Sequence, residues 1–337
     1  MTNMRNKLIL LAFLLLSGST IQAQEKPALY LSSYTYDAKT GKLGTIKSLD
    51  GASLNNLKIA GPDAAAISFK NNQLSVKPTA RKAGKPLHIE VNGQPFTILK
   101  NDFIDNKVIA HRGAWKHTGA TENSIGALNA AFQLGCKGSE FDVHMSADSV
   151  LFIHHDAVIS GLKIEESTAA QLRTLKLDNG EALPTLEDYL TAGMKQQKTK
   201  LILEIKASVI SKARGIALEK RVLKMVQDMQ AQAWVDYISF DYDICKELIK
   251  DAPYARVAYL NGDKSPAALA AEHFFGLDYH ISVFKKNPIW IREAKDLKLD
   301  VNVWTVNEEA DMDYFLKEGA DVITTNEPEL LLKKTAK

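Results

Sequence analysis

Residues 108–113 read VIAHRG, residues 139–143 read SEFDV and residues 201–206 read LILEIK. In the first and third stretches a short apolar run ends in charged or titratable side chains, and in the second two acids alternate with Phe141 and Val143. Further apolar runs follow along the chain, and stretches with the spacing of amphipathic helices separate most of them. Repeated strand–helix units of this length are typical of a parallel β-sheet. These stretches therefore decide the fold class, which we predict to be α/β.

The part of the chain from Lys107 onward supplies about eight such units in about 230 residues. The expected strands are 108–110, 139–143, 150–154, 201–205, 237–240, 256–259, 279–282, 301–304 and 321–324. The expected helices include 124–134, 184–197, 213–230, 288–298 and 308–317. This count predicts a closed (β/α)8 TIM barrel. An open doubly wound sheet would normally carry a glycine-rich phosphate loop after its first strand, and the sequence has none there.

Composition changes near residues 101–106, so we expect a module of residues 24–103 and a barrel domain of residues 104–337. Expected strands in the module are 28–34, 57–59, 65–70, 74–76 and 87–91. The alternating runs and the turn signals between them predict a small all-β, sandwich-like domain. The module carries no cluster of acids, bases or metal ligands. We therefore favour a packing or positioning role for it over glycan or surface binding.

Residues 1–23 have the pattern of a secretory signal peptide. Arg5 and Lys7 form the charged start, residues 8–16 the apolar core, and Ile21-Gln22-Ala23 a small-residue cleavage site. The apolar core is about half the ~20 residues that a spanning helix needs. We expect cleavage, export across the inner membrane to the periplasm, and no transmembrane segment in the mature chain.

The net charge of the chain limits the kinds of partner that we expect. The chain has 42 basic and 40 acidic residues, and residues 1–23 contain two basic and no acidic ones. The mature chain is therefore formally neutral, and no strong field favours nucleic acid or an anionic membrane surface. We expect a small-molecule substrate that is selected by a local site, and no nucleic-acid partner.

Charged, titratable and aromatic side chains end several of the expected strands. Residues two apart on a strand point to the same face. In a barrel the C-terminal ends of the strands meet at one rim, where the active site lies. We therefore expect one site to gather the side chains at these ends, which are His111, Arg112, Glu140, Asp142, His155, Glu204, Lys206 and Trp304.

Glu140, Asp142 and Glu204 are the acids expected to converge at that rim. At about 4 Å, each pair of carboxylates repels by roughly 4 kcal/mol at an effective dielectric near 20. A divalent cation turns this repulsion into attraction, and oxygen ligands favour Mg²⁺ or Ca²⁺ over Zn²⁺. We predict one such cation on these three residues, which leaves His111 and His155 free for proton transfer.

The barrel portion resembles the glycerophosphodiester phosphodiesterase family. Each matching motif is weak or moderately specific alone, but eight in family order are a strong signal. The resemblance implies a (β/α)8 enzyme that hydrolyses glycerophosphodiesters to sn-glycerol 3-phosphate and an alcohol. The matching stretches are 108–113, 122–124, 140–143, 155–156, 183–187, 203–206, 239–241 and 303–307.

The resemblance also implies roles for individual residues. His111 and His155 would be the general base and acid, Arg112 and Lys206 would bind the phosphate, and Trp304 would line the pocket. Glu140, Asp142 and Glu204 would bind the metal, and Glu122 would be a further ligand or an orienting residue. The sequence departs from the family pattern at Thr121, in the short segment 157–162 and at Asn326. The departures leave the catalytic set intact and leave the alcohol group open.

Several alternatives stay open. The nucleophile is either water or a neighbouring glycerol hydroxyl, which would first give a cyclic phosphate. One rival is a lysophospholipid or sphingolipid head-group phosphodiesterase that acts through a cyclic phosphate; a wide apolar rim with Trp115 and Phe284 would favour it. The other rival is a non-catalytic exported protein that binds phosphate esters. No motif indicates the oligomeric state.

Overall fold

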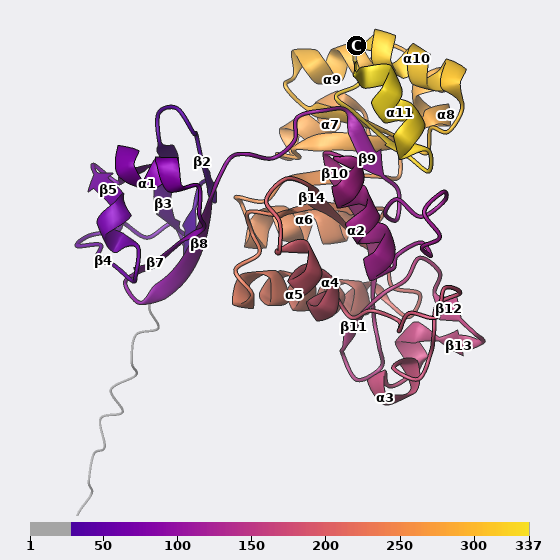
Figure 1. Cartoon of the computed structure of the whole chain (residues 1–337), viewed down its shortest axis with the longest axis horizontal. Helices are drawn as coiled ribbons and strands as arrows, with labels where there is room; N and C mark the ends of the chain where they lie inside the picture. Colours follow the sequence, from indigo (N-terminus) through magenta and orange to yellow (C-terminus); the bar gives the residue numbers. More distant parts are fainter. Residues whose placement is uncertain (1–27, 337) are drawn as a thin grey trace, which may run out of the picture.

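A computed structural model describes residues 28–336 of the chain. The predicted signal peptide, residues 1–23, lies outside the described residues. No helix in residues 28–336 combines the length and the apolar character needed to cross a membrane. An N-terminal β-module, indigo and violet in Figure 1, is followed by a larger α/β barrel.

The β-module consists of two four-stranded sheets, with strand orders β1-β3-β6-β5 and β2-β8-β7-β4. The predicted separate β-region is therefore confirmed, with one short helix added. Its core contains Leu31 and Ile46 from the first sheet and Ile89 and Ile98 from the second. The elements are β1 (Leu29–Leu31), β2 (Thr35–Tyr36), β3 (Lys42–Ser48), β4 (Ile59–Ala60), η1 (Ala64–Ala66), β5 (Ile67–Lys70), β6 (Gln73–Val76), α1 (Pro78–Ala83), β7 (Leu87–Val91) and β8 (Gln94–Lys100).

Three strands of the module lie outside the expected set: the two-residue β2, and the longer β3 and β8. In β3 the register shifts between Lys42 and Gly44, and Gly44 has a φ of +150°. Such a bulge interrupts the period-two pattern by which a strand is recognised. In β8 the residues 96–99 are all buried, so apolar and polar residues do not alternate there.

The α/β part is a closed barrel of eight parallel strands, as predicted. Strand β9 pairs with both β19 and β10, which closes the cylinder. The strand at 150–154 is also present, but β11 (Leu151–Ile153) pairs antiparallel with β10 and does not belong to the eight. The eight strands, in order around the barrel, are β9 (Val108–Ala110), β10 (Gly138–Met145), β14 (Lys200–Ile205), β15 (Val235–Ser239), β16 (Val257–Tyr259), β17 (Gly276–His280), β18 (Asp300–Trp304) and β19 (Val322–Thr325).

Helices pack around the barrel (Figure 1). In α2 the Ser124 side chain accepts a hydrogen bond from the Ala127 N–H, and Gly135 ends the helix with a φ of +77°, as the sequence predicts. The helices are α2 (Ile125–Leu134), α4 (Leu186–Gly193), α5 (Lys212–Asp228), α6 (Tyr242–Asp251), α7 (Pro266–Ala271), α8 (Ile281–Lys286), α9 (Trp290–Asp296), α10 (Glu309–Glu318) and α11 (Pro328–Thr335).

In the barrel, two predicted elements have a boundary that differs from the structure by more than two residues. The strand expected at 279–282 ends at His280, because the His280 side chain accepts from the Ser282 N–H and starts α8. The helix expected at 184–197 spans only α4. It begins after Thr185, which forms a capping box with Asp188.

An insert of residues 154–185 leaves the barrel between β11 and α4. It has its own small apolar cluster, which includes Ile159, Ile164 and Leu172. The Thr121 hydroxyl accepts a hydrogen bond from the Asn179 N–H at 3.0 Å, which ties the insert to the loop before α2. The insert contains β12 (Val158–Ile159), β13 (Leu162–Lys163), η2 (Ile164–Glu166) and α3 (Ala169–Leu172).

The β-module contacts the barrel through loops that lead into barrel strands. The Thr97 hydroxyl donates to Gln230 Oε1 at 2.6 Å, and the ring centroids of Tyr34 and Tyr254 lie 5.0 Å apart. Gln230 precedes β15 and Tyr254 precedes β16. These contacts therefore lie at the N-terminal end of the barrel strands, opposite the end where a barrel carries its active site.

Glu219 of α5 is fully buried, and neither of its carboxyl oxygens has a hydrogen-bond partner among the described residues. Burial and the nearby charge of Asp251 raise the pKa of Glu219 to about 7. The folded protein thus holds the carboxyl proton of Glu219 more tightly than the unfolded chain does. The contribution of Glu219 to the free energy of unfolding is therefore fully present below the pKa that Glu219 has in the unfolded chain. It is lost as the pH rises through the folded-state pKa of about 7.

We expect Glu219→Gln to remove this pH dependence, because glutamine fills the site without ionising. Between pH 5 and pH 8 the stability advantage of the variant over the native chain should grow by about 2 to 3 kcal/mol. Urea unfolding of both proteins at the two pH values measures this change. A constant difference would show that Glu219 does not titrate in the folded state.

Candidate active site

Three carboxylates meet inside the barrel. Glu140 and Asp142 flank Phe141, whose ring stacks on Tyr189 of α4 with centroids 4.2 Å apart. Because alternate strand residues face opposite sides, the two acids face the barrel interior. Asp142 lies beside Glu204 of β14 in the register. One oxygen of each acid lies within 4.8 Å of the others, so the structure brings the three predicted metal ligands together.

The burial of these acids shifts their pKa values. Burial and the charges of Asp142 and Glu204 raise the pKa of Glu140 well above its usual range. Burial and the Asp142 charge raise the pKa of Glu204 to about 8. For Asp142, burial acts upward, but Lys206 and other nearby cations outweigh it, and the pKa is lowered. The surrounding protein therefore does not stabilise three ionised carboxylates by itself.

A hard divalent cation fits this donor set. Glu140 Oε1 is buried and has no hydrogen-bond partner within residues 28–336. A cation between the acids would stabilise the ionised form of all three and would give this oxygen a partner. Carboxylate oxygens are ligands for both Mg²⁺ and Ca²⁺.

Arg112 joins the first strand end to the acids. Its backbone N–H donates to Glu140 Oε2 at 2.9 Å, and its φ of +57° turns the chain sharply. Gly113 is required next to it, because an added Cβ would lie 2.7 Å from Ala127 of α2. The guanidinium Nη1 donates to Glu122 Oε1 at 2.9 Å. Glu122 therefore orients Arg112, and its carboxylate is not one of the three that converge.

Lys206 lies between two of the acids. Its Nζ is 3.2 Å from Asp142 Oδ1 and 2.8 Å from Glu204 Oε1. These two carboxylates raise the pKa of Lys206 above its usual value, although burial acts in the opposite direction. The Lys206 side chain therefore carries a positive charge beside the acids, as the phosphate-binding role predicted for this residue requires.

His111 is held by Asn326, with Nδ1 2.8 Å from Asn326 Oδ1. An amide oxygen only accepts, so Nδ1 carries the proton and Nε2 has a free lone pair. Nε2 lies 4.0 Å from Glu140 Oε2, beside the acids. Burial and the Arg112 charge lower the pKa of His111 to about 4, so the ring is neutral at neutral pH. This is the state that a general base needs.

His155 is held by its neighbour in sequence. Its Nδ1 donates to Asp156 Oδ1 at 2.7 Å. The charge of His155 contributes to the pKa values of both His111 and Asp142, so the two histidines and the acids share one electrostatic environment. The hydrogen bond to Asp156 orients the imidazole ring, as a group that transfers protons requires.

Three residues that position this set were not identified as site residues from the sequence. Asn123 donates through Nδ2 to Asp142 Oδ2 at 2.8 Å, and Asn326 and Asp156 hold the two histidines. Asn123 and Asp156 lie within the recognised motifs, and Asn326 was noticed only as a departure from the family pattern. Their partners are distant in sequence or depend on side-chain direction, which spacing alone does not reveal.

Trp304 ends β18 at the C-terminal rim of the barrel, where the acids lie. Its Nε1 donates to the Asp278 carbonyl at 2.8 Å, and its ring contacts Phe240 edge-on at 5.4 Å between centroids. Of the two aromatic residues expected at the rim, only Phe284 lies elsewhere. Phe284 is only 1% exposed and packs against core aromatics. Trp115 is half-buried and lines a groove beside the site.

That groove has a volume of about 570 Å³ and lies between the insert and the loop before α2. The residues that line it include Glu122 and Asp156, which are the partners of Arg112 and His155, together with Trp115 and Lys176. The groove therefore starts on the His155 side of the site and offers space for one arm of a substrate.

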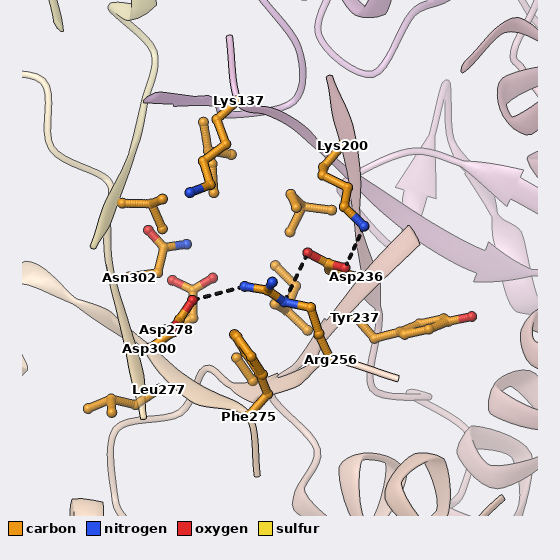
Figure 2. Close-up of a pocket in the computed structure, with 15 residues that line it drawn as sticks. Lys137, Lys200, Asp236, Tyr237, Arg256, Phe275, Leu277, Asp278, Asp300 and Asn302 are labelled. Carbon is orange, nitrogen blue, oxygen red and sulfur yellow. Dashed lines mark hydrogen bonds and ion pairs between the residues drawn. The ribbon is translucent and has the colours of Figure 1, made fainter. Parts of the chain in front are cut away.

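A second cavity, of about 70 Å³, lies at the opposite end of the barrel (Figure 2). Arg256 crosses it between Asp300, at 2.9 Å, and Asp236, at 3.5 Å. Lys200 also pairs with Asp236, at 3.3 Å. None of the predicted site residues lines it, and it takes no part in the site described above.

Comparisons with known proteins agree with this architecture. A crystal structure of a glycerophosphodiester phosphodiesterase from Parabacteroides distasonis covers 69% of this chain and 98% of its own, with 42% identity and a TM-score of 0.68. A glycerophosphodiester phosphodiesterase from Caldanaerobacter subterraneus is 28% identical over 249 residues, which are 68% of this chain and 98% of the relative.

An Oleispira antarctica phosphodiesterase, solved in complex with the product sn-glycerol-3-phosphate, shares the fold at 23% identity. It covers 69% of this chain and 97% of its own, with a TM-score of 0.58. The model of the glycerophosphoryl diester phosphodiesterase family matches residues 111–330, which span the barrel from its first strand end to α11. The chain therefore belongs to the glycerophosphoryl diester phosphodiesterase family of enzymes.

Proposed function

We propose that this protein is an exported, metal-dependent hydrolase that cleaves glycerophosphodiesters to sn-glycerol 3-phosphate and an alcohol. The observation that carries the proposal is the convergence of Glu140, Asp142 and Glu204 beside two histidines whose Nδ1 atoms are both anchored. Export through residues 1–23 and a periplasmic location stay predictions, because these residues lie outside the described part of the chain.

The phosphate is bound by fixed positive charges. Arg112 and Lys206 lie on opposite sides of Asp142 and would contact the phosphate oxygens. A divalent cation on the three acids would supply a Lewis-acid contact to a phosphate oxygen and would offset its charge. Together these groups stabilise the negative charge that builds up in the transition state.

The two histidines divide the proton transfers. His111 is neutral, and its free Nε2 accepts the proton of the nucleophile. His155 is oriented by its hydrogen bond to Asp156 and donates a proton to the oxygen of the leaving alcohol. Because Asp156 lines the groove, the alcohol leaves towards the groove and the glycerol arm lies on the other side of the acids.

The nucleophile is water or the neighbouring glycerol hydroxyl. A single turnover in ¹⁸O-water separates the two routes. Direct attack places one ¹⁸O in the first phosphate product, whereas attack by the hydroxyl gives an unlabelled cyclic phosphate that is labelled only when it opens.

The proposed activity is tested by supplying glycerophosphocholine, glycerophosphoethanolamine and glycerophosphoinositol with Mg²⁺ or Ca²⁺. We expect sn-glycerol 3-phosphate as the common product, detected by an enzyme-coupled assay. Binding of these compounds without turnover, under every cation condition, would instead indicate a non-catalytic phosphate-ester binding protein.

A further inference from the structure

We propose that His144 is a positioning residue for the reaction, because it holds the backbone that carries His155. This inference rests on the proposed function. His144 lies on β10, and residues two apart on a strand face the same side, so it shares the inner face with Glu140 and Asp142. It is only 2% exposed. The imidazole therefore lies on the inner face of the strand that carries two of the predicted metal ligands.

The imidazole of His144 binds the main chain of His155. Its Nε2 lies 3.1 Å from the His155 carbonyl oxygen. A carbonyl oxygen only accepts, so Nε2 carries the proton and donates it. Nδ1 then has a free lone pair, and it is buried without a hydrogen-bond partner among residues 28–336. Because a buried acceptor without a partner costs free energy, packing alone does not explain a histidine at this position.

The segment that carries His155 is attached to β10 at two points. The His154 N–H donates to the Asp142 carbonyl at 3.1 Å, and the hydrogen bond from His144 follows one residue later. The contact of His155 with Asp156 is different, because it joins neighbours in sequence and the Asp156 side chain is 72% exposed. Asp156 therefore orients the ring, whereas His144 fixes the distance between the backbone of His155 and the acids.

This distance matters for the step in which His155 donates its proton. A proton donor must lie within hydrogen-bond reach of the leaving oxygen, and a displacement of about 1 Å can lower the rate about 10²-fold. The phosphate is bound by other groups, which are Arg112, Lys206 and the cation. Loss of the hydrogen bond from His144 should therefore lower kcat and leave KM nearly unchanged.

Three substitutions of His144 test this hydrogen bond with glycerophosphocholine. His144→Phe keeps a ring but removes the donor, and it should lower kcat by about 10- to 100-fold with KM within about twofold. His144→Gln places an amide N–H near the position of Nε2 and should keep kcat within about threefold of the native value. His144→Asn is too short to reach the carbonyl, so it should lose as much activity as His144→Phe and replaces that variant if it does not fold.

A change of leaving group separates positioning from a general structural role. The p-nitrophenyl ester of glycerol 3-phosphate releases an oxygen that needs no proton. With this ester, kcat of His144→Phe should lie within about twofold of the native value. Equal losses on the ester and on glycerophosphocholine would overturn the inference and leave the proposed function intact, as would native rates of His144→Phe on both substrates.

A double variant tests whether His144 acts through His155. On glycerophosphocholine, His144→Phe/His155→Gln should be no more than about twofold slower than His155→Gln alone, because the displaced group is already missing. A double variant whose loss is the product of the two single losses would assign His144 an effect of its own and would overturn the inference.

Met145→Ala is the matched control. Met145 is also 2% exposed and follows His144 on β10, but its side chain faces the other side of the strand. The variant should lower the midpoint of thermal unfolding and keep kcat on both substrates within about twofold. A loss on glycerophosphocholine as large as that of His144→Phe would overturn the inference. Inactivity of the native protein on both substrates would refute the proposed function itself, and the inference with it.

Discussion

Chelation of divalent cations is expected to abolish turnover, and added Mg²⁺ or Ca²⁺ should restore it. Without a cation, burial and mutual repulsion raise the pKa values of Glu140 and Glu204, the latter to about 8, so that Glu204 is mostly protonated at neutral pH. The acids would then be only partly ionised and would hold no cation to offset the charge of the phosphate. Initial rates on glycerophosphocholine, before and after chelation and after cation return, measure the effect.

The same geometry predicts the pH dependence of cation binding. Glu204, whose pKa is raised to about 8, must lose its proton to bind the cation, so binding releases a proton at pH 7 and becomes tighter as the pH rises towards 8. Calorimetric titration in buffers of different ionisation enthalpy counts the protons. Asp142→Asn should abolish binding, whereas Asp278→Asn, at an equally buried acid of the same barrel, should not. Full turnover in excess chelator would refute the metal site.

Replacement of either histidine is expected to lower kcat by about 10² to 10⁴, the usual contribution of a positioned proton-transfer group. His111→Gln removes the base and His155→Gln removes the acid, while both keep a hydrogen-bonding side chain. Steady-state kinetics on glycerophosphocholine measure the losses. Calorimetric cation binding should stay nearly unchanged, which separates a chemical effect from damage to the site.

A change of leaving group separates the two roles. With a p-nitrophenyl ester of glycerol 3-phosphate, the departing oxygen needs no proton, so His155→Gln should recover most of its activity and His111→Gln should not. Equal recovery of both variants would contradict the assignment of His155 to the leaving-alcohol side. Near-native rates of either variant on glycerophosphocholine would remove that histidine from the mechanism.

The barrel and its acids could be predicted because their signals are local. A buried parallel strand is a continuous apolar run, and polar residues at its end must lie at the rim, which places Glu140, Asp142 and Glu204 together without further information. The residues that tune the site could not be predicted in this way. Asn326 reaches His111 only because the barrel closes β19 against β9, and sequence spacing does not report that contact.

The residues around the catalytic opening were also difficult to predict from the sequence. Aromatic character suggested Trp115 and Phe284 for the rim, but the direction of a side chain in a loop depends on what packs beside it. Phe284 belongs to the short helix α8 and points into the core. The exposed apolar residues Val209 and Ile210 instead lie in a loop that a hydrogen bond to Glu165 of the insert holds in place, and no local pattern links residues 165 and 209.

The contacts between the β-module and the barrel lie at the base of the cylinder, below the strands whose upper ends hold the acids. A partner that bound the module would therefore leave the catalytic opening accessible to diffusing substrate, because module and opening lie at opposite ends of the barrel.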